Sequence, residues 1–272
     1  MDLEALVRAA LEEDIGGGDV TTEACIGADS QSTGFLIAKQ DLVVAGQAAA
    51  AAVFAEMGAQ YVVEQEDGAE VTKGTVVARV SGNTRAILTG ERLALNFLMR
   101  LSGIATNTRE HVRAAGGAFS VIDTRKTTPL HRTLEKAAVR AGGGKNHRFA
   151  LYDGVLIKDN HLQACGGVEE AVSRARAAAH HLLAIEVEAE TLAQALQAVD
   201  AGADCVLLDN MDDERLREAV DALKGRVRTE ASGNMTVERL TQLREKGIQP
   251  DQVSIGGLIH QARWVDLSLE LD

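Results

Sequence analysis

The second half of the chain alternates short apolar runs with amphipathic helical stretches, and this alternation constrains the fold more than any other feature. Apolar and β-branched runs recur at 119–123, 154–158, 183–187, 204–208, 227–230 and 252–255. Helical spacing separates most of them, as at 168–180, 192–201 and 237–246. Apolar strands alternating with helices are typical of a parallel sheet covered by helices. No G-x-G-x-x-G follows the first run to mark a dinucleotide crevice, so we predict an α/β barrel rather than an open sheet.

Each predicted strand ends in polar or charged residues. In chain order these are DTRK, KDNH, EVE, LDN, EASGN and SIGG. The carboxyl ends of barrel strands share one rim, which is where barrel enzymes carry their active sites. Six polar strand ends therefore predict a functional site at that rim.

The first hundred residues follow another pattern. Helical spacing at 3–13, 47–57 and 90–111 surrounds strand-like runs at 34–38 and 61–64. The stretch EDGAEVTKGTVVARVSG predicts two short strands with glycine turns between them. Its turn pattern is that of a biotinyl or lipoyl carrier domain, but the turn shows no obvious acceptor lysine in a hairpin context. We therefore expect a separate β-rich substructure.

Positive charge is concentrated in one segment of an acidic protein. Residues 125–158 hold eight basic and two acidic residues, or +6, in a chain whose 28 Lys+Arg and 40 Asp+Glu sum to −12. A local cationic region predicts a small, highly charged anion as ligand. Lys136 with Arg132 and Arg140, at four-residue helical spacing, is expected on a solvated face. The better candidates, at strand ends or in the glycine-rich turn, are Arg125, Lys126, Arg148 and Lys158.

The turn GGGKNHR, residues 142–148, is predicted to be a flexible loop whose backbone N–H groups close over an anion. His147 beside Arg148 is a candidate donor to a carboxylate.

Carboxylates end two neighbouring predicted strands. Glu188 and Asp209 occupy these ends, and Glu186 shares the face of Glu188 by strand alternation. With no His or Cys expected nearby, oxygen ligands of this kind suit Mg²⁺ bound together with phosphate. Ser232–Asn234 and 255–257 follow the last two strands, and small residues there allow backbone amides to reach a phosphate.

Composition excludes several classes of function. Aromatic residues make up 3% and the net charge is −12, which argues against a nucleic-acid binder. The three cysteines, Cys25, Cys165 and Cys205, stand far apart with no CxxC pair, which argues against a zinc site among them. Their odd number in a chain expected to be cytosolic implies no disulfide framework. The longest apolar stretch, 48–55, is too short to span a bilayer, and the acidic amino terminus is no secretory signal. We therefore expect a cytoplasmic protein without membrane partners.

Taken together, these segments resemble one known family. Residues 123–161, DTRKTTPLHRTLEKAAVRAGGGKNHRFALYDGVLIKDNH, are similar to the core of quinolinate phosphoribosyltransferases, the decarboxylating nicotinate-nucleotide pyrophosphorylases of NAD synthesis. Further matches occur in order along almost the whole chain: EEDIGGGDVTTEA, GERLALNFLMRLSGIAT, IEVEAETLAQAL, VLLDNM, EASGNM and IGGLIHQARWVDLSLEL.

The resemblance implies a fold of two parts and a homodimer. An amino-terminal α/β sandwich (1–105) would be completed by the carboxyl-terminal segment 262–272, and residues 106–261 would form an incomplete, TIM-like α/β barrel. Each site of the dimer would borrow Arg92 from its neighbour.

The resemblance also implies an activity and residue roles. The chain would transfer a phosphoribosyl group from 5-phosphoribosyl 1-pyrophosphate (PRPP) to quinolinate with loss of CO₂, using Mg²⁺. The quinolinate carboxylates would contact Arg92, Arg125, His147, Arg148 and Lys158. PRPP would contact Lys126, Glu188, Asp209, Ser232, Gly233, Asn234, Ile255, Gly256 and Gly257. Lys126, Lys158, Glu188 and Asp209 would be the catalytic residues, with Glu188 and Asp209 holding Mg²⁺ directly or through PRPP and water. Asn234 replaces a glycine common in the family, and no loss is expected because the backbone amides remain.

Three alternatives are open at this stage. A related molybdenum-system homologue would share the fold, although the complete set of cations argues against it. A Schiff-base aldolase would use Lys158 as nucleophile. A non-catalytic anion sensor would have no reason to keep both Glu188 and Asp209.

Overall fold

The computed structural model describes residues 2–272, which divide into two compact units. Unit 1 contains the chain up to Arg109, Thr127–Gly143 and Ile259–Asp272. Unit 2 contains Glu110–Lys126 and Gly144–Leu258. Helix α4 (Thr84–Ala115) contributes residues to both.

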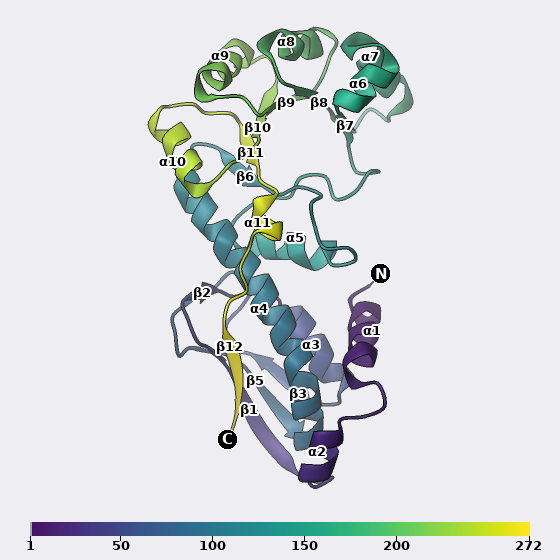
Figure 1. The fold of residues 1–272 in the computed structure, drawn as a ribbon, viewed down its shortest axis with the longest axis vertical. Helices are drawn as coiled ribbons and strands as arrows, with labels where there is room; N and C mark the ends of the chain where they lie inside the picture. Colours follow the sequence, from purple (N-terminus) through teal and green to yellow (C-terminus); the bar gives the residue numbers. More distant parts are fainter. Residues whose placement is uncertain (1) are drawn as a thin grey trace. The chain divides into compact units, whose positions relative to one another are not determined.

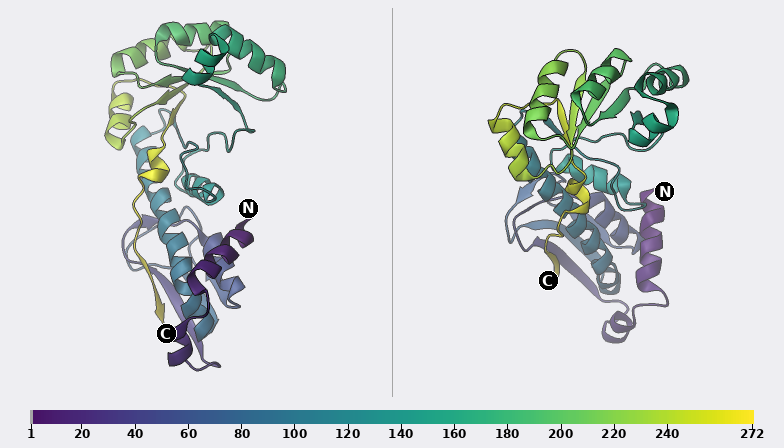
Figure 2. Two further views of the ribbon diagram at one scale, coloured as in Figure 1. Left: turned by 45° about the vertical axis from the view of Figure 1, so that its right-hand side comes forward. Right: turned by 45° about the horizontal axis from the view of Figure 1, so that its top comes forward.

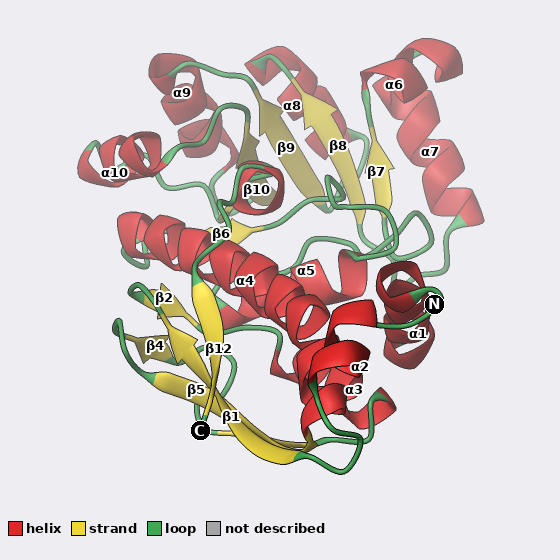
Figure 3. Ribbon diagram, turned by 60° about the horizontal axis from the view of Figure 1, so that its bottom comes forward, coloured by secondary structure: helices red, strands yellow, loops and turns green. Residues whose placement is uncertain are grey.

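Unit 1 is built on an antiparallel sheet that the end of the chain completes. Its strand order is β12 (Leu267–Leu271), β1 (Gln31–Ala38), β5 (Val76–Asn83), β3 (Gln60–Val63). The carboxyl-terminal strand β12 pairs with β1 from Gly34↔Leu271 to Ala38↔Leu267 (Figure 3). A second small sheet pairs β2 (Leu42–Val43) with β4 (Glu70–Val71). The predicted amino-terminal α/β layer and its returning last strand are thus confirmed.

Helices of unit 1 supply its core. These are α1 (Leu3–Ile15), α2 (Val20–Cys25), α3 (Gln47–Glu56) and the first part of α4. The alanine-rich α3 buries Val53 and Phe54 completely. Gly103 lets the last segment of the chain cross α4 closely, because a Cβ there would lie 2.1 Å from the backbone oxygen of Arg263.

Residues 127–143, which we expected in the barrel part, group with unit 1. This segment contains α5 (Arg132–Ala141) and is tied to α4 by two arginines. Arg100 forms an ion pair with the buried Glu135 at 3.1 Å, and Arg109 Nε donates to Gly142 O at 2.9 Å. The expectation of a solvated face on α5 is wrong for Lys136, which is only 1% exposed, because that face packs into the unit.

Unit 2 is a parallel sheet of six strands in the order β6 (Ser120–Ile122), β11 (Gln252–Ser254), β10 (Arg228–Ser232), β9 (Cys205–Asp209), β8 (Ile185–Ala189), β7 (Val155–Ile157). The first and second strands of this unit, β6 and β7, form the two edges, so the barrel is not closed. Its helices are α6 (Asp159–Cys165), α7 (Val168–Ala178), α8 (Leu192–Asp200), α9 (Asp213–Leu223) and α10 (Val237–Glu245). Helix α11 (Gly257–His260) begins in unit 2 and ends in unit 1. Helices α7 to α9 line the outer side of the curved sheet (Figures 1 and 2). The incomplete α/β barrel is confirmed.

The two faces of the sheet differ in polarity. The face packed by helices carries buried apolar residues such as Val187, Leu208 and Val253. Strand register puts Glu186 beside Cys205, and Glu230 beside Gln252, on the other face. The prediction of strands that are apolar throughout is therefore wrong, since alternate residues of β8, β10 and β11 are polar.

None of the helices in the described part of the chain is long and apolar enough to cross a membrane.

Candidate active site

The carboxyl edge of the parallel sheet gathers most of the predicted site residues. Lys158 follows β7, Glu188 lies at the end of β8, Asp209 ends β9 and Ser232 ends β10. The register pairs Asp209 directly with Ser232. Because parallel strands bring their carboxyl ends together, residues far apart in sequence meet here.

Lys158 and Glu188 form an ion pair across neighbouring strands. The side chain of Lys158 is about half exposed, whereas that of Glu188 is largely buried. The backbone N–H of Lys158 donates to Nδ1 of His161 at 2.9 Å, which holds the turn into α6. A cation at the sheet edge is thus balanced by a carboxylate in the free protein.

Arg148 and Arg125 lie close enough to repel one another. The pKa of Arg148 is lowered, first by burial and then by the positive charge of Arg125. Arg148 Nη1 donates to Gly154 O at 2.8 Å. Among the described residues, the side chains of Arg125 and Lys126 have no hydrogen-bond or ion-pair partner, and both are exposed. This region therefore carries positive charge that an anion would neutralise.

The segment 142–148 is not the flexible amide loop that we expected. Lys145 forms a parallel bridge to Ile122, and its N–H donates to Val121 O at 2.9 Å. The N–H of His147 donates to Oδ1 of the buried Asp123 at 2.8 Å. These amides are used to cover the outer edge of β6, so they do not face a ligand.

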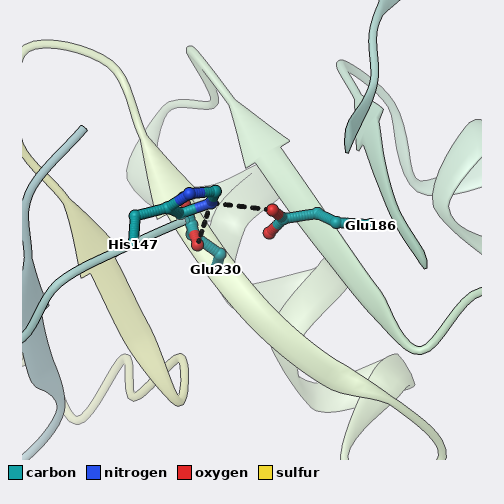
Figure 4. A group of neighbouring side chains, drawn as sticks. All are labelled: His147, Glu186 and Glu230. Atoms are coloured by element: carbon teal, nitrogen blue, oxygen red, sulfur yellow. Dashed lines mark hydrogen bonds and ion pairs between the residues drawn. The ribbon is translucent and has the colours of Figure 1, made fainter. Parts of the chain in front are cut away.

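His147 contacts two buried carboxylates on the polar face of the sheet (Figure 4). Its Nε2 lies 2.9 Å from Glu186 Oε2 and 3.7 Å from Glu230 Oε2. Its other ring nitrogen, Nδ1, accepts the backbone N–H of Arg148 at 2.8 Å. Cys205 Sγ also donates to Glu186 Oε1 at 3.3 Å, so a histidine and a cysteine lie beside Glu186, whereas the expectation of no His or Cys nearby concerned Glu188 and Asp209.

The two carboxyl groups have pKa values shifted in opposite directions. Burial acts to raise the pKa of Glu186, but hydrogen bonds from His147 and Cys205 act in the opposite direction and the pKa is lowered. The pKa of Glu230 is raised well above its ordinary value by burial and by the charge of Glu186. One of the pair therefore keeps its proton, as expected for two carboxyl groups sharing a buried site.

A tight corner follows β9 and β10. Asn210, Gly233 and Asn234 all have positive φ, at 53°, 97° and 48°. A Cβ on Gly233 would lie 2.2 Å from Asn210 Oδ1, so only glycine fits there. Asparagine tolerates the left-handed conformation at Asn234, which explains how it replaces glycine. Asn210 Nδ2 in turn donates to Asp209 Oδ2 at 2.7 Å and orients that carboxylate.

The turn after β11 follows a simpler pattern. The N–H of Ile255 donates to Ile122 O at 2.9 Å, so this amide extends the sheet. Gly256 and Gly257 come next and lead into α11, where a phosphate could approach the backbone closely.

Arg92 belongs to unit 1, on α4. It is exposed, and its guanidinium forms no hydrogen bond or ion pair with any described residue. Burial raises the pKa of the neighbouring Glu91. Arg92 and Glu91 form no hydrogen bond, although the positive charge of Arg92 acts to lower the Glu91 pKa against the effect of burial.

Four further residues of the site were not singled out from the sequence. Asp123 and Asn146 join β6 to the segment 142–148, Glu230 completes the carboxylate pair, and Asn210 supports Asp209. Their strand-end positions were the available signal for Asp123 and Asn210. Glu230 opens the polar strand end EASGN, but nothing in the sequence linked it to Glu186, which lies two strands away across β9.

Comparison with known proteins agrees over the whole chain. The family model described as quinolinate phosphoribosyl transferase, N-terminal domain, matches residues 19–102, and that for the C-terminal domain matches residues 104–270. A relative from Bacillus subtilis (strain 168), named probable nicotinate-nucleotide pyrophosphorylase [carboxylating], is 42% identical over 100% of this chain and 94% of its own length. Quinolinate phosphoribosyltransferase [decarboxylating] 2a, mitochondrial, from Nicotiana tabacum is 39% identical over 100% of this chain and 82% of its own length.

Solved structures give the same result. The crystal structure of NadC from Streptococcus pyogenes matches with a TM-score of 0.95 and 41% identity, covering 99% of this chain and 96% of that one. The nicotinate-nucleotide pyrophosphorylase from Francisella tularensis matches with a TM-score of 0.94 and 36% identity, with the same coverage of both chains. With both of its domains matched in order, the chain belongs to the quinolinate phosphoribosyltransferase family.

Proposed function

We propose that this protein is a pentosyltransferase that transfers the phosphoribosyl group of PRPP to quinolinate with decarboxylation. The products are nicotinate mononucleotide, pyrophosphate and CO₂, and the reaction serves NAD synthesis. The observation that carries the proposal is the meeting of cations and carboxylates at one sheet edge in a chain that matches this family throughout. A dianion and a polyanion can be brought together only where positive charge is dense.

The carboxylates of quinolinate bind to the cationic side of the edge. Arg125 and Arg148 supply planar donors, Lys158 a point charge, and His147 lies beside them. Arg92 of the partner subunit completes this set in a homodimer with shared sites. The negative charge of quinolinate relieves the repulsion between Arg125 and Arg148, and this relief favours binding of a dianion.

PRPP occupies the neighbouring strand ends. Lys126 lies between quinolinate and the pyrophosphate, and Glu188 and Asp209 bind the ribose hydroxyls. The 5′-phosphate fits the turns after the last two strands, where close backbone approach is possible. Those turns comprise Ser232, Gly233, Asn234, Ile255, Gly256 and Gly257.

The chemistry requires no general base. The lone pair of the pyridine nitrogen attacks C1 of the ribose, the C1–O bond breaks, and pyrophosphate leaves with that electron pair. Positive charge develops on the ribose and is stabilised by Glu188 and Asp209, while Lys126 stabilises the leaving group. The C2–carboxylate bond then breaks and CO₂ departs, its electron pair stays on C2 beside the positive ring nitrogen that stabilises it, and C2 takes up a proton.

The donor set at Glu188 and Asp209 fits Mg²⁺. Both ligands offer only oxygen, and they lie on the same face of neighbouring strands. Two carboxylates are too few for a protein cage, which matches the preference of Mg²⁺ for sites shared with phosphate and water. The ion would shield the negative charge of the pyrophosphate when PRPP binds.

The ion pair of Lys158 disfavours the Schiff-base alternative. A lysine nucleophile needs dry surroundings, whereas Lys158 is half exposed and paired with Glu188.

An assay of product formation tests the proposal. The protein mixed with quinolinate, PRPP and Mg²⁺ should release CO₂ and nicotinate mononucleotide, and Arg125→Ala should lose most of this activity. Lys224→Ala is the matched control, because Lys224 is an exposed cation that caps the carboxyl end of α9, ahead of β10. An inactive wild-type protein, or equal loss in both variants, would refute the proposal. A cytoplasmic location belongs to the proposal too, and cell fractionation tests it.

A further inference from the structure

We propose that Glu186 is a positioning residue that fixes Arg148 through the ring of His147, so that His147 acts on the substrate indirectly. This inference rests on the proposed function for the identity of the substrate. The hydrogen bonds on which this inference is based are present in the protein without bound substrate. It assigns roles to Glu186 and Glu230, which no substrate contact explains.

The hydrogen-bond partners of the His147 ring show which of its two nitrogens carries the proton. Nδ1 accepts the N–H of Arg148 at 2.8 Å, so Nδ1 carries no proton. Nε2 therefore carries the ring proton and donates it to Glu186 Oε2 at 2.9 Å. With both nitrogens used inside the chain, the ring is a neutral bridge and has no donor left for a carboxylate of quinolinate.

The bridge is anchored on buried groups at its far end. Glu186 and Glu230 are 7% and 0% exposed, and Gln252 Nε2 donates to Glu230 Oε2 at 3.1 Å. Cys205 Sγ donates to the second oxygen of Glu186. An acceptor held in this way can adopt few alternative positions, so the ring that donates to it is held as well.

The near end of the bridge sets the backbone of Arg148. The N–H of His147 is bound to Asp123 and the N–H of Arg148 is bound to the ring, which fixes two consecutive peptide groups. The guanidinium of Arg148 is then steadied by Gly154 O. Removing the acceptor at Glu186 leaves a buried N–H unpaired, the ring turns, and Arg148 loses its fixed backbone.

Two substitutions at Glu186 show whether His147 needs a hydrogen-bond acceptor there or a negative charge. Glu186→Met has similar length and no acceptor, and we expect the KM for quinolinate to rise about tenfold while kcat and the KM for PRPP change less than about threefold. Glu186→Gln should stay within about threefold of wild type in all three, because its oxygen accepts from His147 and its NH₂ faces Cys205 Sγ. Glu169→Gln, an exposed carboxylate on α7, is the control.

Three kinetic results would overturn the proposal. A fall in kcat at unchanged KM would give Glu186 a direct part in the chemistry, and equal rises in both KM values would show only a structural role. If Glu186→Gln were as defective as Glu186→Met, His147 would need a negative partner and would act as an imidazolium.

A spectroscopic measurement decides the question without turnover or substitution at Glu186. The enzyme labelled with ¹⁵N-histidine shows seven rings, and His147→Gln identifies the signal of residue 147. At pH 7, with and without quinolinate, Nε2 should be protonated and Nδ1 not. Protonation of both nitrogens on addition of quinolinate would refute the neutral bridge. If the wild-type enzyme did not turn over quinolinate, the proposed function would fail while the tautomer in the free protein still tested the bridge.

Discussion

The buried carboxylate of Asp123 accepts the backbone N–H of His147 at 2.8 Å and so ties the segment 142–148 to the end of β6. Asn146 Nδ2 donates to the other oxygen of Asp123 at 2.6 Å. Through this one carboxylate, the first strand of the sheet fixes the segment that carries Arg148. The open edge of the barrel is thereby used to position part of the proposed quinolinate site.

The corner at Gly233 gives a prediction about stability. Gly233→Ala should lower the free energy of unfolding by roughly 2–4 kcal/mol, because a Cβ meets Asn210 in a left-handed backbone conformation. It should also raise the KM for PRPP, whose phosphate is placed at this turn.

The control for this variant is Gly202→Ala. Gly202 has φ +91° but no atom within 4 Å of a built Cβ, so only the conformational cost of about 1 kcal/mol remains. Denaturant titration of both variants measures the difference. Equal losses of stability at the two positions would show that the contact with Asn210 is unimportant.

The raised pKa of Glu230 predicts how the free energy of unfolding depends on pH. Its folded-state pKa is raised, so the folded protein holds a proton that the unfolded chain releases near the ordinary glutamate value. The stabilisation is fully present at low pH and is lost as pH rises through the folded-state pKa. Glu230→Gln cannot ionise, so its stability relative to wild type should increase as pH rises.

Urea titrations between about pH 5 and about pH 9 measure this trend. Glu169→Gln, which removes an exposed charge, should show no such rise. A Glu230→Gln variant whose relative stability is constant or falls with pH would contradict the assignment of the shared proton.

The features that could be predicted from the sequence are those that depend on neighbouring residues along the chain. The six strands of unit 2 and most of its helices follow from periodicity, and the polar strand ends predicted the edge where Lys158, Glu188 and Asp209 lie. The contact of Glu186 with Glu230 depends on the register of three strands, which periodicity does not give. The burial of Lys136 likewise depends on which face of α5 packs into unit 1.

The segment 142–148 shows the same limit. Glycines predicted a flexible loop, yet the residues after them run beside β6 and form a bridge to it. The free edge of an incomplete barrel needs such a cover, and a barrel that closes fully would not. The family resemblance predicted that the barrel is incomplete, but it did not predict that the segment 142–148 covers the open edge.

Metal dependence follows from the oxygen ligands at the sheet edge. EDTA should abolish activity, and Mg²⁺ or Mn²⁺ should restore it, while a zinc-selective chelator has little effect. Asp209→Asn should need more Mg²⁺ for half-maximal activity, and the control Glu169→Gln should not. Full activity after EDTA treatment would refute the roles of Glu188 and Asp209 as holders of magnesium.

The shared site predicts recovery of activity in mixed dimers. Arg92→Ala and Lys158→Ala should each be nearly inactive, because every site has lost a cation. After subunit exchange, one site of each heterodimer carries both defects and the other carries neither. About a quarter of wild-type activity should return, since half of the dimers are mixed and one of their two sites is intact. Proven exchange without recovery would show that Arg92 acts within its own chain.

The proposed reaction is tested most directly by following the 2-carboxylate of labelled quinolinate. Quinolinate labelled at the 2-carboxylate should release labelled CO₂ only when PRPP and Mg²⁺ are present, with nicotinate mononucleotide and pyrophosphate formed in equal amounts. Nicotinate in its place should react poorly, because it lacks one carboxylate and loses hydrogen bonds to charged groups that contribute on the order of 1.5–3 kcal/mol. Labelled CO₂ matched one to one by nicotinate mononucleotide is the predicted result. Comparable turnover of nicotinate, or release of CO₂ without PRPP, would contradict it.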